Sequence, residues 1–183
     1  PNPYRDAFWK WWPDLYKELK HFRMTGGEPL MDPNTYRVFD YVLENPKEDL
    51  HLNVTSNFSV EQKLFDKYMG YVQKLTDGVT IEHFMQFVSL DTVGKQAEYI
   101  RHGLDYELCK SRIEQFVKEV PYRSSLTFIM TMNNLSIINL KQLLEFVLYL
   151  RQTYTDTYQR IWFDTPLLYT PDWQSIQLLP KAY

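Results

Sequence analysis

The sequence predicts an α/β fold, built either as an open parallel sheet or as a sector of a β/α barrel. Across 183 residues, segments with the alternating pattern of β-strands are separated by segments with the spacing of amphipathic helices. This alternation is typical of right-handed βαβ units, which bring the carboxyl ends of all strands to one edge of the sheet. The length fits one domain with a substantial core.

Each expected element follows from local pattern. The expected strands are 21–26 (HFRMTG), 50–57 (LHLNVTSN), 83–91 (HFMQFVSLD), 124–132 (SSLTFIMTM) and 158–168 (YQRIWFDTPLL). The expected helices are 6–20, 32–45, 59–75, 94–101, 105–119 and 136–153. Asp32 is a candidate cap with Pro33 in the first turn, and Ser59 with Gln62 has the pattern of a capping box. Pro13 is expected to kink or restart the first helix.

Composition excludes several classes of protein. Hydrophobic residues make up 44% and aromatic residues 16%, which argues against disorder. The net charge of −3 and the lack of a basic cluster argue against nucleic acid and anionic lipid as partners. The longest apolar runs fall short of the roughly 18 residues that cross a bilayer. A single cysteine, Cys109, excludes an internal disulfide and favours a reducing, cytoplasmic location.

Candidate functional residues lie at or just after the carboxyl ends of the expected strands, at the edge where α/β folds bind ligands. They are Gly26, Gly27, Glu28, Thr55, Ser56, Asn57, Ser89, Asp91, Thr131, Asn133 and Asp164. The two glycines permit a positive φ and close approach of a ligand to the backbone. Glu28 beside them would place a carboxylate where a cationic group docks. The simpler interpretation is a tight turn with a solvated glutamate.

The next two strand ends each allow a ligand contact or a structural role. Ser56 and Asn57 suit hydrogen bonds to a polar ligand, or capping of the next helix by Asn57 or Ser59. Ser89 and Asp91 are two residues apart, so on a strand they share a face and could bind a ribose diol. Alternatively, Asp91 caps the helix that follows.

Other chemistry-bearing residues carry weaker signals. The four histidines, His21, His51, His83 and His102, lack metal-ligand spacing and are expected to be surface or packing residues. Cys109 lies in a helical segment and is expected to be a packed thiol. Three tryptophans, Trp9, Trp11 and Trp12, suit either a binding face or, more commonly, a helix packed on a core. The chain has no P-loop, GxGxxG or GxSxG motif.

A strand ending in GGEP, then one ending in TSN, then one ending in SLD, resembles the radical S-adenosylmethionine superfamily. The segment IWFDTPLLYTPDW is similar to the sixth-strand region of members with a SPASM or twitch extension. The resemblance covers about residues 20–171. It implies strands 2 to 6 of a (β/α)6 barrel over residues 1–171, with 172–183 beginning a C-terminal extension or linker.

The resemblance also implies roles for individual residues. Gly26, Gly27 and Glu28 match the segment that binds the amino group of S-adenosylmethionine. The remaining matches are Ser56 and Asn57 near the methionine moiety, Ser89 and Asp91 near the ribose and carboxylate, and Ile129 and Met132 near the adenine. The implied activity is cleavage of S-adenosylmethionine to a 5′-deoxyadenosyl radical that abstracts hydrogen from a substrate, expected to be a peptide or protein.

The chain departs from this family in one large respect. The family holds a four-iron four-sulfur cluster on a CxxxCxxC loop after its first strand, and this sequence contains neither that loop nor that strand. Cys109 lies in the wrong element to replace it. Two interpretations stay open: a fragment of a radical enzyme, inactive alone, or a cluster-less binding module on the same fold. Without the first strand, residues 21–26 are expected to form an unprotected edge, which leads either to pairing with another chain or to a loose first helix.

A hydrolase on a barrel scaffold is a further alternative. In it, Glu28 would form an acid/base pair with Asp91 or Asp164. The two glycines before Glu28 suit a ligand ammonium better than proton transfer.

Overall fold

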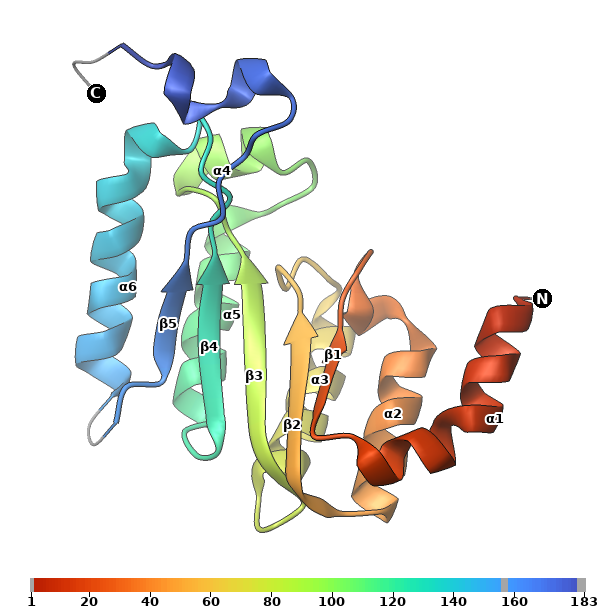
Figure 1. The fold of residues 1–183 in the computed structure, drawn as a ribbon. Coiled ribbons are helices and arrows are strands. Elements are labelled where there is room, and N and C mark those ends of the chain that lie inside the picture. Colours follow the sequence, from red (N-terminus) through yellow and green to blue (C-terminus); the bar gives the residue numbers. More distant parts are fainter. Residues whose placement is uncertain (1, 156–157, 181–183) are drawn as a thin grey trace.

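The computed structural model describes residues 2–155 and 158–180 as an α/β fold with one five-stranded sheet (Figure 1). All strand pairs are parallel, and the order β1-β2-β3-β4-β5 follows the sequence. The strands are β1 His21–Met24, β2 Lys47–Thr55, β3 Ile81–Ser89, β4 Ser124–Ile129 and β5 Ile161–Asp164. The predicted alternation of helices with parallel strands is therefore confirmed.

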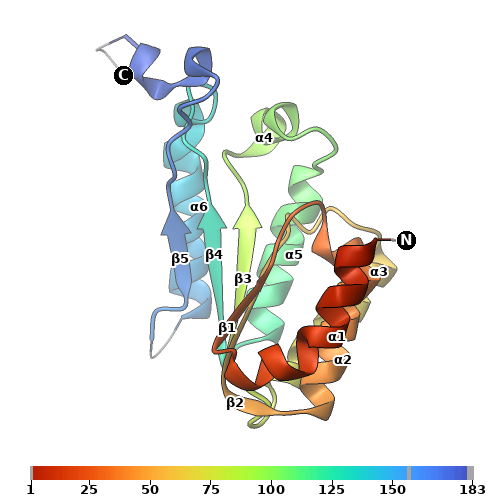
Figure 2. The same cartoon turned by 45° about the vertical axis from the view of Figure 1, so that its right-hand side comes forward.

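The described residues also form six α-helices and four short 3-10 turns, most of which connect successive strands. The helices are α1 Pro3–Glu18, α2 Pro33–Glu44, α3 Gln62–Thr76, α4 Gly94–Ile100, α5 Tyr106–Glu119 and α6 Leu140–Tyr154. The 3-10 turns are η1 Pro29–Met31, η2 Ile137–Asn139, η3 Asp172–Gln174 and η4 Ile176–Leu178. Figures 1 and 2 show α2, α3, α5 and α6 on one side of the sheet. Sequential strands with helices on one side are typical of a barrel sector, whereas a doubly wound sheet reverses its strand order.

Several expected boundaries are wrong by a few residues. The strand β1 ends at Met24 because Gly26 and Gly27 adopt positive φ and turn the chain. The helix α3 begins at Gln62 with Glu61 as its cap, so the capping box expected at Ser59 does not form. Pro13 does not restart α1, which is one helix over Pro3–Glu18, but the helix bends along its length (Figure 1). The cap predicted at Asp32 is confirmed, because its side chain accepts a hydrogen bond from the Asn34 amide at 2.9 Å.

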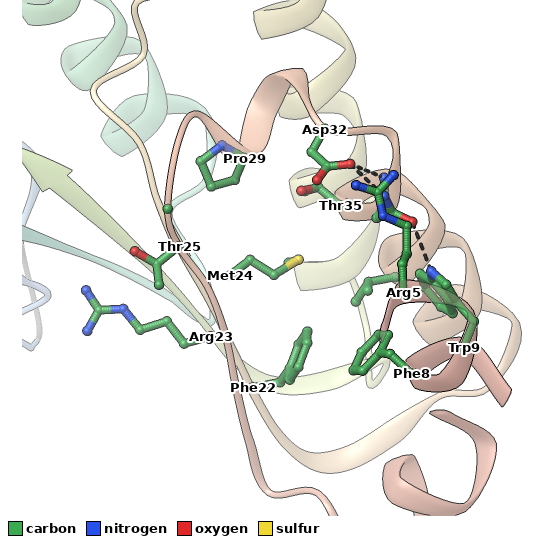
Figure 3. Close-up of a pocket in the computed structure, with 13 residues that line it drawn as sticks. Arg5, Phe8, Trp9, Phe22, Arg23, Met24, Thr25, Pro29, Asp32 and Thr35 are labelled. Carbon is green, nitrogen blue, oxygen red and sulfur yellow. Dashed lines mark hydrogen bonds between the residues drawn. The ribbon is translucent and has the colours of Figure 1, made fainter. Parts of the chain in front are cut away.

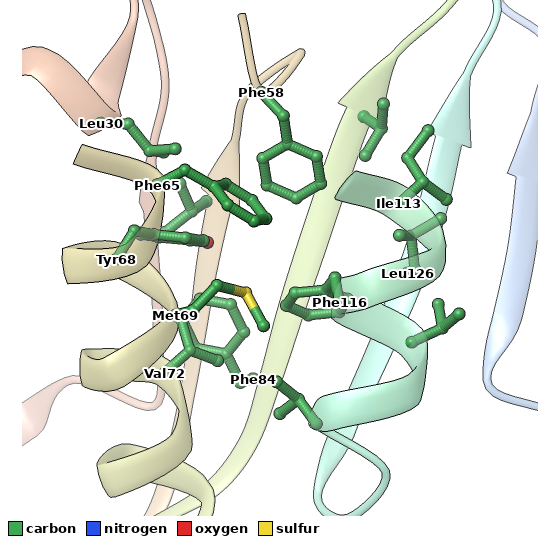
Figure 4. Packing of buried hydrophobic residues seen from close by; sticks show 14 of the residues in the cluster. Leu30, Phe58, Phe65, Tyr68, Met69, Val72, Phe84, Ile113, Phe116 and Leu126 are labelled. Atoms are coloured by element: carbon green, nitrogen blue, oxygen red, sulfur yellow. The ribbon is translucent and has the colours of Figure 1, made fainter. Parts of the chain in front are cut away.

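The main core lies between the sheet and the helices α3 and α5 (Figure 4). Phe84 from β3 lies within 6.4 Å of the Phe116 ring of α5 and 6.3 Å of the Tyr68 ring of α3, measured between centroids. All three side chains are fully buried. Aromatic burial of this extent is the largest single contribution to a core. It holds the sheet and its helices as one unit, so the strand ends are presented on a rigid scaffold.

The residues after β5 return to the carboxyl edge of the sheet. Met132 and Leu167 form an isolated parallel bridge there. Asn134 donates from its main-chain amide to the Gln174 carbonyl and from its side chain to the Trp173 carbonyl, both at 2.9 Å. Part of the expected extension at 172–183 is thus attached to the β4–α6 connection, and residues 181–183 lie outside the described residues. None of the described helices has the length and apolar character needed to span a bilayer.

Candidate functional site

Gly26 and Gly27 join β1 to η1 in a conformation that favours glycine. Their φ values are +88° and +56°, in the left-handed region that residues with a Cβ rarely adopt. A Cβ built at either position would meet no heavy atom within 4 Å. The backbone at this strand end is therefore open, as the sequence predicts for a close approach to a ligand.

Glu28 follows the glycines and is half-buried rather than solvated. Its carboxylate accepts a hydrogen bond from the Leu30 amide at 3.1 Å and so caps η1. Burial raises the pKa of Glu28, while hydrogen bonds from Leu30, the Ser56 hydroxyl and the Asn57 main chain act in the opposite direction. The Glu28 carboxylate at one strand end therefore lies close to the end of the next strand.

Ser56 and Asn57 shape the turn after β2. The Ser56 hydroxyl accepts from the Phe58 amide and the Asn57 side chain accepts from the Ser59 amide, both at 2.9 Å. Phe58 between them has a φ of +60°. These turns leave the Ser56 hydroxyl and the Asn57 main chain close to Glu28. Neither Asn57 nor Ser59 caps α3, so the capping interpretation is wrong.

Asp91 has a structural partner that sequence reasoning missed. Its two oxygens accept from the Arg101 Nε at 2.6 Å and from the Arg101 Nη2 at 3.1 Å. One of them also accepts from the Thr131 amide at 2.8 Å. Asp91 is buried and does not cap the following helix, whose cap is Val93. The carboxylate therefore joins the ends of β3 and β4 to α4. Ser89, the last residue of β3, is half-buried.

The remaining predicted residues are placed as follows. Thr55 accepts two hydrogen bonds from Arg23, from Nε at 3.2 Å and from Nη2 at 3.1 Å. Asn133 is buried and its side chain accepts from the Leu135 and Ser136 amides, which makes it a turn residue. Asp164 is exposed at the end of β5, beside Ile129 of β4. Met132 is half-buried.

The predicted residues thus form two groups at the carboxyl edge. Glu28, Ser56 and Asn57 are linked at the ends of β1 and β2. Asp91 and Thr131 are linked at the ends of β3 and β4. The first group lies beside an open backbone and its carboxylate accepts from neutral donors, whereas the carboxylate of the second group is paired with the Arg101 cation. Of the two carboxylates, Glu28 is therefore the one whose recorded partners among the described residues are all neutral.

A cavity of about 300 Å³ lies between β1 and α1 (Figure 3). Its lining includes Phe8 and Trp9 from α1, Phe22 and Met24 from β1, and Gly26. Of the predicted site residues, only Gly26 contributes to it. The sequence signal for this cavity was the aromatic face of the first helix.

Three histidines that sequence reasoning treated separately lie in a row across the sheet. His21 pairs with His51 and His51 with His83 in the strand register. The His21 and His51 rings stack at 4.5 Å between centroids, and His83 Nε2 lies 2.8 Å from the Ser125 hydroxyl. The sequence signal for this row was that each of the three histidines falls near the start of an expected strand. Among residues 2–155 and 158–180, no three His, Cys, Asp or Glu side chains are placed to hold a metal ion.

The residues of this chain do not fit an iron–sulfur cluster. Its one cysteine, Cys109, is buried in α5, on the covered side of the sheet. Burial raises the pKa of Cys109 to about 12, so the thiol stays protonated, whereas iron requires a thiolate. No family model matches the sequence, and a search of curated proteins finds no significant relative.

Proposed function

We propose that this chain is the S-adenosylmethionine-binding core of a radical S-adenosylmethionine enzyme of the SPASM or twitch type. The observation that carries the proposal is the pairing of two open, positive-φ glycines with a carboxylate tied to the next strand end. Glycine carbonyls and the Glu28 carboxylate are acceptors, which is the chemistry an ammonium group requires. The sequential parallel sheet supports the proposal at the level of the fold.

Within this proposal, Glu28 receives the amino group of the ligand, and Ser56 and Asn57 hold the carboxylate in place. The cluster cysteines belong to a segment outside these 183 residues, since Cys109 cannot serve. The chain by itself is expected to be catalytically inactive. A peptide or protein is the proposed substrate class of the complete enzyme.

The test is equilibrium binding by calorimetry. S-adenosylmethionine is compared with methylthioadenosine, which lacks the amino acid group, on the wild-type chain, Glu28→Gln and Glu61→Gln. Glu61 is exposed and makes no side-chain cap, which makes it a matched control. We expect the wild type to prefer S-adenosylmethionine, Glu28→Gln to lose about tenfold in affinity for it alone, corresponding to ~1.4 kcal/mol, and Glu61→Gln to change nothing. Equal binding of both ligands by the wild type would contradict the proposal.

A cluster-less binding module on the same fold is the second candidate, favoured by the buried, protonated Cys109. The two candidates differ in the complete protein. A chain extended to include neighbouring coding sequence, loaded with iron and sulfide, forms 5′-deoxyadenosine only if the first candidate is right. A hydrolytic pair of Glu28 with Asp91 gains no support, because both Asp91 oxygens already accept hydrogen bonds.

A further inference from the structure

We propose that the outer face of α6 is an interface with a second copy of this chain. The two α6 helices pair in the antiparallel sense about a twofold axis that passes at Leu144. This face consists of a leucine row, Leu140, Leu144 and Leu148, with Lys141 and Glu145 along one side of it. The proposal does not depend on the proposed function, because α6 contributes none of the residues that were given a role in ligand binding.

The helix α6 has apolar side chains on two faces. The side chains that it buries against the rest of the fold are Leu143, Phe146, Val147 and Leu150. On the outer face, Leu144 is 42% exposed and Leu148 is 52% exposed. Leu140, Leu144 and Leu148 follow one another at four-residue spacing, so they form one row along the helix. A surface helix normally has polar residues opposite its buried face, and an exposed apolar row therefore indicates a further partner.

The described part of the chain leaves the leucine row uncovered. The row lines a hollow of about 370 Å³, and every described residue that lines this hollow belongs to α6. The neighbours of α6 lie on its other sides. Arg151 donates from Nε to the Ile161 carbonyl of β5 at 2.9 Å, and α5 is the adjacent helix. Figure 1 shows α6 at the end of the helix layer, where a second molecule can reach its outer face.

The two charged residues beside the row indicate that the partner is a second copy. Lys141 and Glu145 have side chains that are 83% and 61% exposed, and their Nζ and Oε1 atoms are 3.8 Å apart. Both lie on the same side of the leucine row. A twofold axis between antiparallel helices brings these same sides together, so Lys141 of each copy faces Glu145 of the other. With the axis at Leu144, the two residues are about 3 Å apart along the helix direction, which their side chains span easily.

The leucine row matches itself under the same axis. Leu144 of one copy meets Leu144 of the other, and Leu140 of each copy lies opposite Leu148 of the other. Apolar and charged groups are therefore complementary in a single arrangement. One such arrangement forms two ion pairs and covers the leucine row of both copies, as an interface made from one surface requires.

The first test is sedimentation velocity over a range of concentrations. The helix α6 has 15 residues and is therefore about 22 Å long. A contact confined to one helix is smaller than a standard interface, so we expect a weak dimer with a dissociation constant on the order of 10 μM. The average mass should rise from that of a monomer to that of a dimer through this range. A monomer at about thirtyfold higher concentration would overturn the proposal.

The second test exchanges the charges. Lys141→Glu and Glu145→Lys each place like charges across the interface, and each should weaken self-association by about tenfold or more. An equimolar mixture of the two variants should form a mixed dimer, because every cross-copy contact again joins opposite charges. Both variants lose the ion pair within the helix, so this pair cannot explain a difference between the mixture and its components. A mixture that stays monomeric would contradict the proposed pairing.

The third test locates the twofold axis by cross-linking. The native Cys109 is buried and leaves the surface free of thiols among the described residues. Under mild oxidation Leu144→Cys should form a disulfide with its own copy, since the two positions meet at the axis. Leu148→Cys should not, because its two copies are about 12 Å apart along the helices, but it should cross-link when mixed with Leu140→Cys. The opposite pattern would overturn the proposed arrangement.

Other occupants of this face predict other results. Leu144→Glu should abolish the dimer while leaving the urea midpoint close to that of the wild type, because Leu144 is partly exposed in the monomer. A dimer that survives Leu144→Glu would place the contact elsewhere, for example at β1, and overturn the proposal. In a chain extended by neighbouring coding sequence, a monomer whose Leu144→Cys thiol resists alkylation would assign the leucine row to a segment outside these 183 residues, and would equally overturn it.

Discussion

Asp91 is bound to Arg101 by two hydrogen bonds, of 2.6 Å and 3.1 Å, across the loop between β3 and the end of α4. The Asp91 side chain is 6% exposed and that of Arg101 is 28% exposed. A further bond from the Thr131 amide completes the contacts of the carboxylate. Buried pairs of this kind cost stability when one partner is removed, since the other is left charged and unpaired.

We therefore expect Asp91→Ala to lower the free energy of unfolding by about 3 kcal/mol. Urea titration measures it. The control is Asp14→Ala, which removes an exposed pair with Lys17 at 2.8 Å and should have no measurable effect. An unchanged midpoint for Asp91→Ala would show that the pair is not structural and would restore Asp91 as a candidate ligand contact.

Glu28→Gln is expected to keep or raise stability at neutral pH while weakening ligand binding. Burial raises the pKa of Glu28 above its unfolded value, so the charged form is disfavoured in the native state. Glu28 therefore contributes to the free energy of unfolding at a pH below its pKa in the unfolded chain. This contribution is lost as the pH rises through its pKa in the folded protein. Urea midpoints at pH 4 and pH 7 measure the effect. Between pH 4 and pH 7 the wild type should lose more stability than Glu28→Gln. The same loss in both proteins would contradict the prediction.

Gly26→Ala is expected to destabilise the protein because of its backbone conformation alone. A φ of +88° costs a residue with a Cβ about 1 kcal/mol, although the added methyl group meets no neighbour. The matched control is Gly70→Ala in the middle of α3, where the space is also open. There alanine should stabilise by about 0.5–1 kcal/mol. Thermal unfolding measures both variants. Shifts of the melting temperature in the same direction for Gly26→Ala and Gly70→Ala would contradict this account.

His83 is expected to make the protein less stable in mild acid. Burial first, and then the neighbouring His51, lower the pKa of His83, with Glu82 acting in the opposite direction. Because this pKa is lowered, His83 contributes to the free energy of unfolding at a pH above its pKa in the unfolded chain. The contribution is lost as the pH falls through its pKa in the folded protein. The His51 and His83 ring centroids are 6.1 Å apart, and the His83 Nε2 lies 2.8 Å from the Ser125 hydroxyl.

The measurement is the free energy of unfolding of His83→Gln between pH 7 and pH 5. We expect it to fall less than that of the wild type over this range. His102→Gln, at an exposed position, is the control and should follow the wild type. A steeper fall for His83→Gln would exclude His83 as the source.

The order of strands and helices could be predicted from the sequence because apolar residues recur with a different period in strands and in helices. Gly26 and Gly27 were also predictable, since a positive φ is a local property that the residue type signals. Boundaries were less reliable where turns compete with caps. Ser59 has the right spacing for a capping box, yet the turns made by Ser56 and Asn57 delay the helix to Gln62.

Residue roles that depend on distant partners were not readable. Asp91 looked like a ligand contact or a cap, and only the packing of α4 brings Arg101 to it. The row of His21, His51 and His83 depends on strand register, which sequence spacing alone does not set.

By itself, the sequence determined a chain of alternating helices and parallel strands with two glycines and a carboxylate at the first strand end. These are local properties of backbone and side-chain period. The tertiary structure decided which carboxylate has a cationic partner, since Arg101 pairs with Asp91 while Glu28 accepts from neutral groups of its own turn and the next strand end. It also decided that β1 ends the sheet formed by the described strands and lies beside a cavity. The reason is physical: a side chain's availability depends on what the fold packs against it.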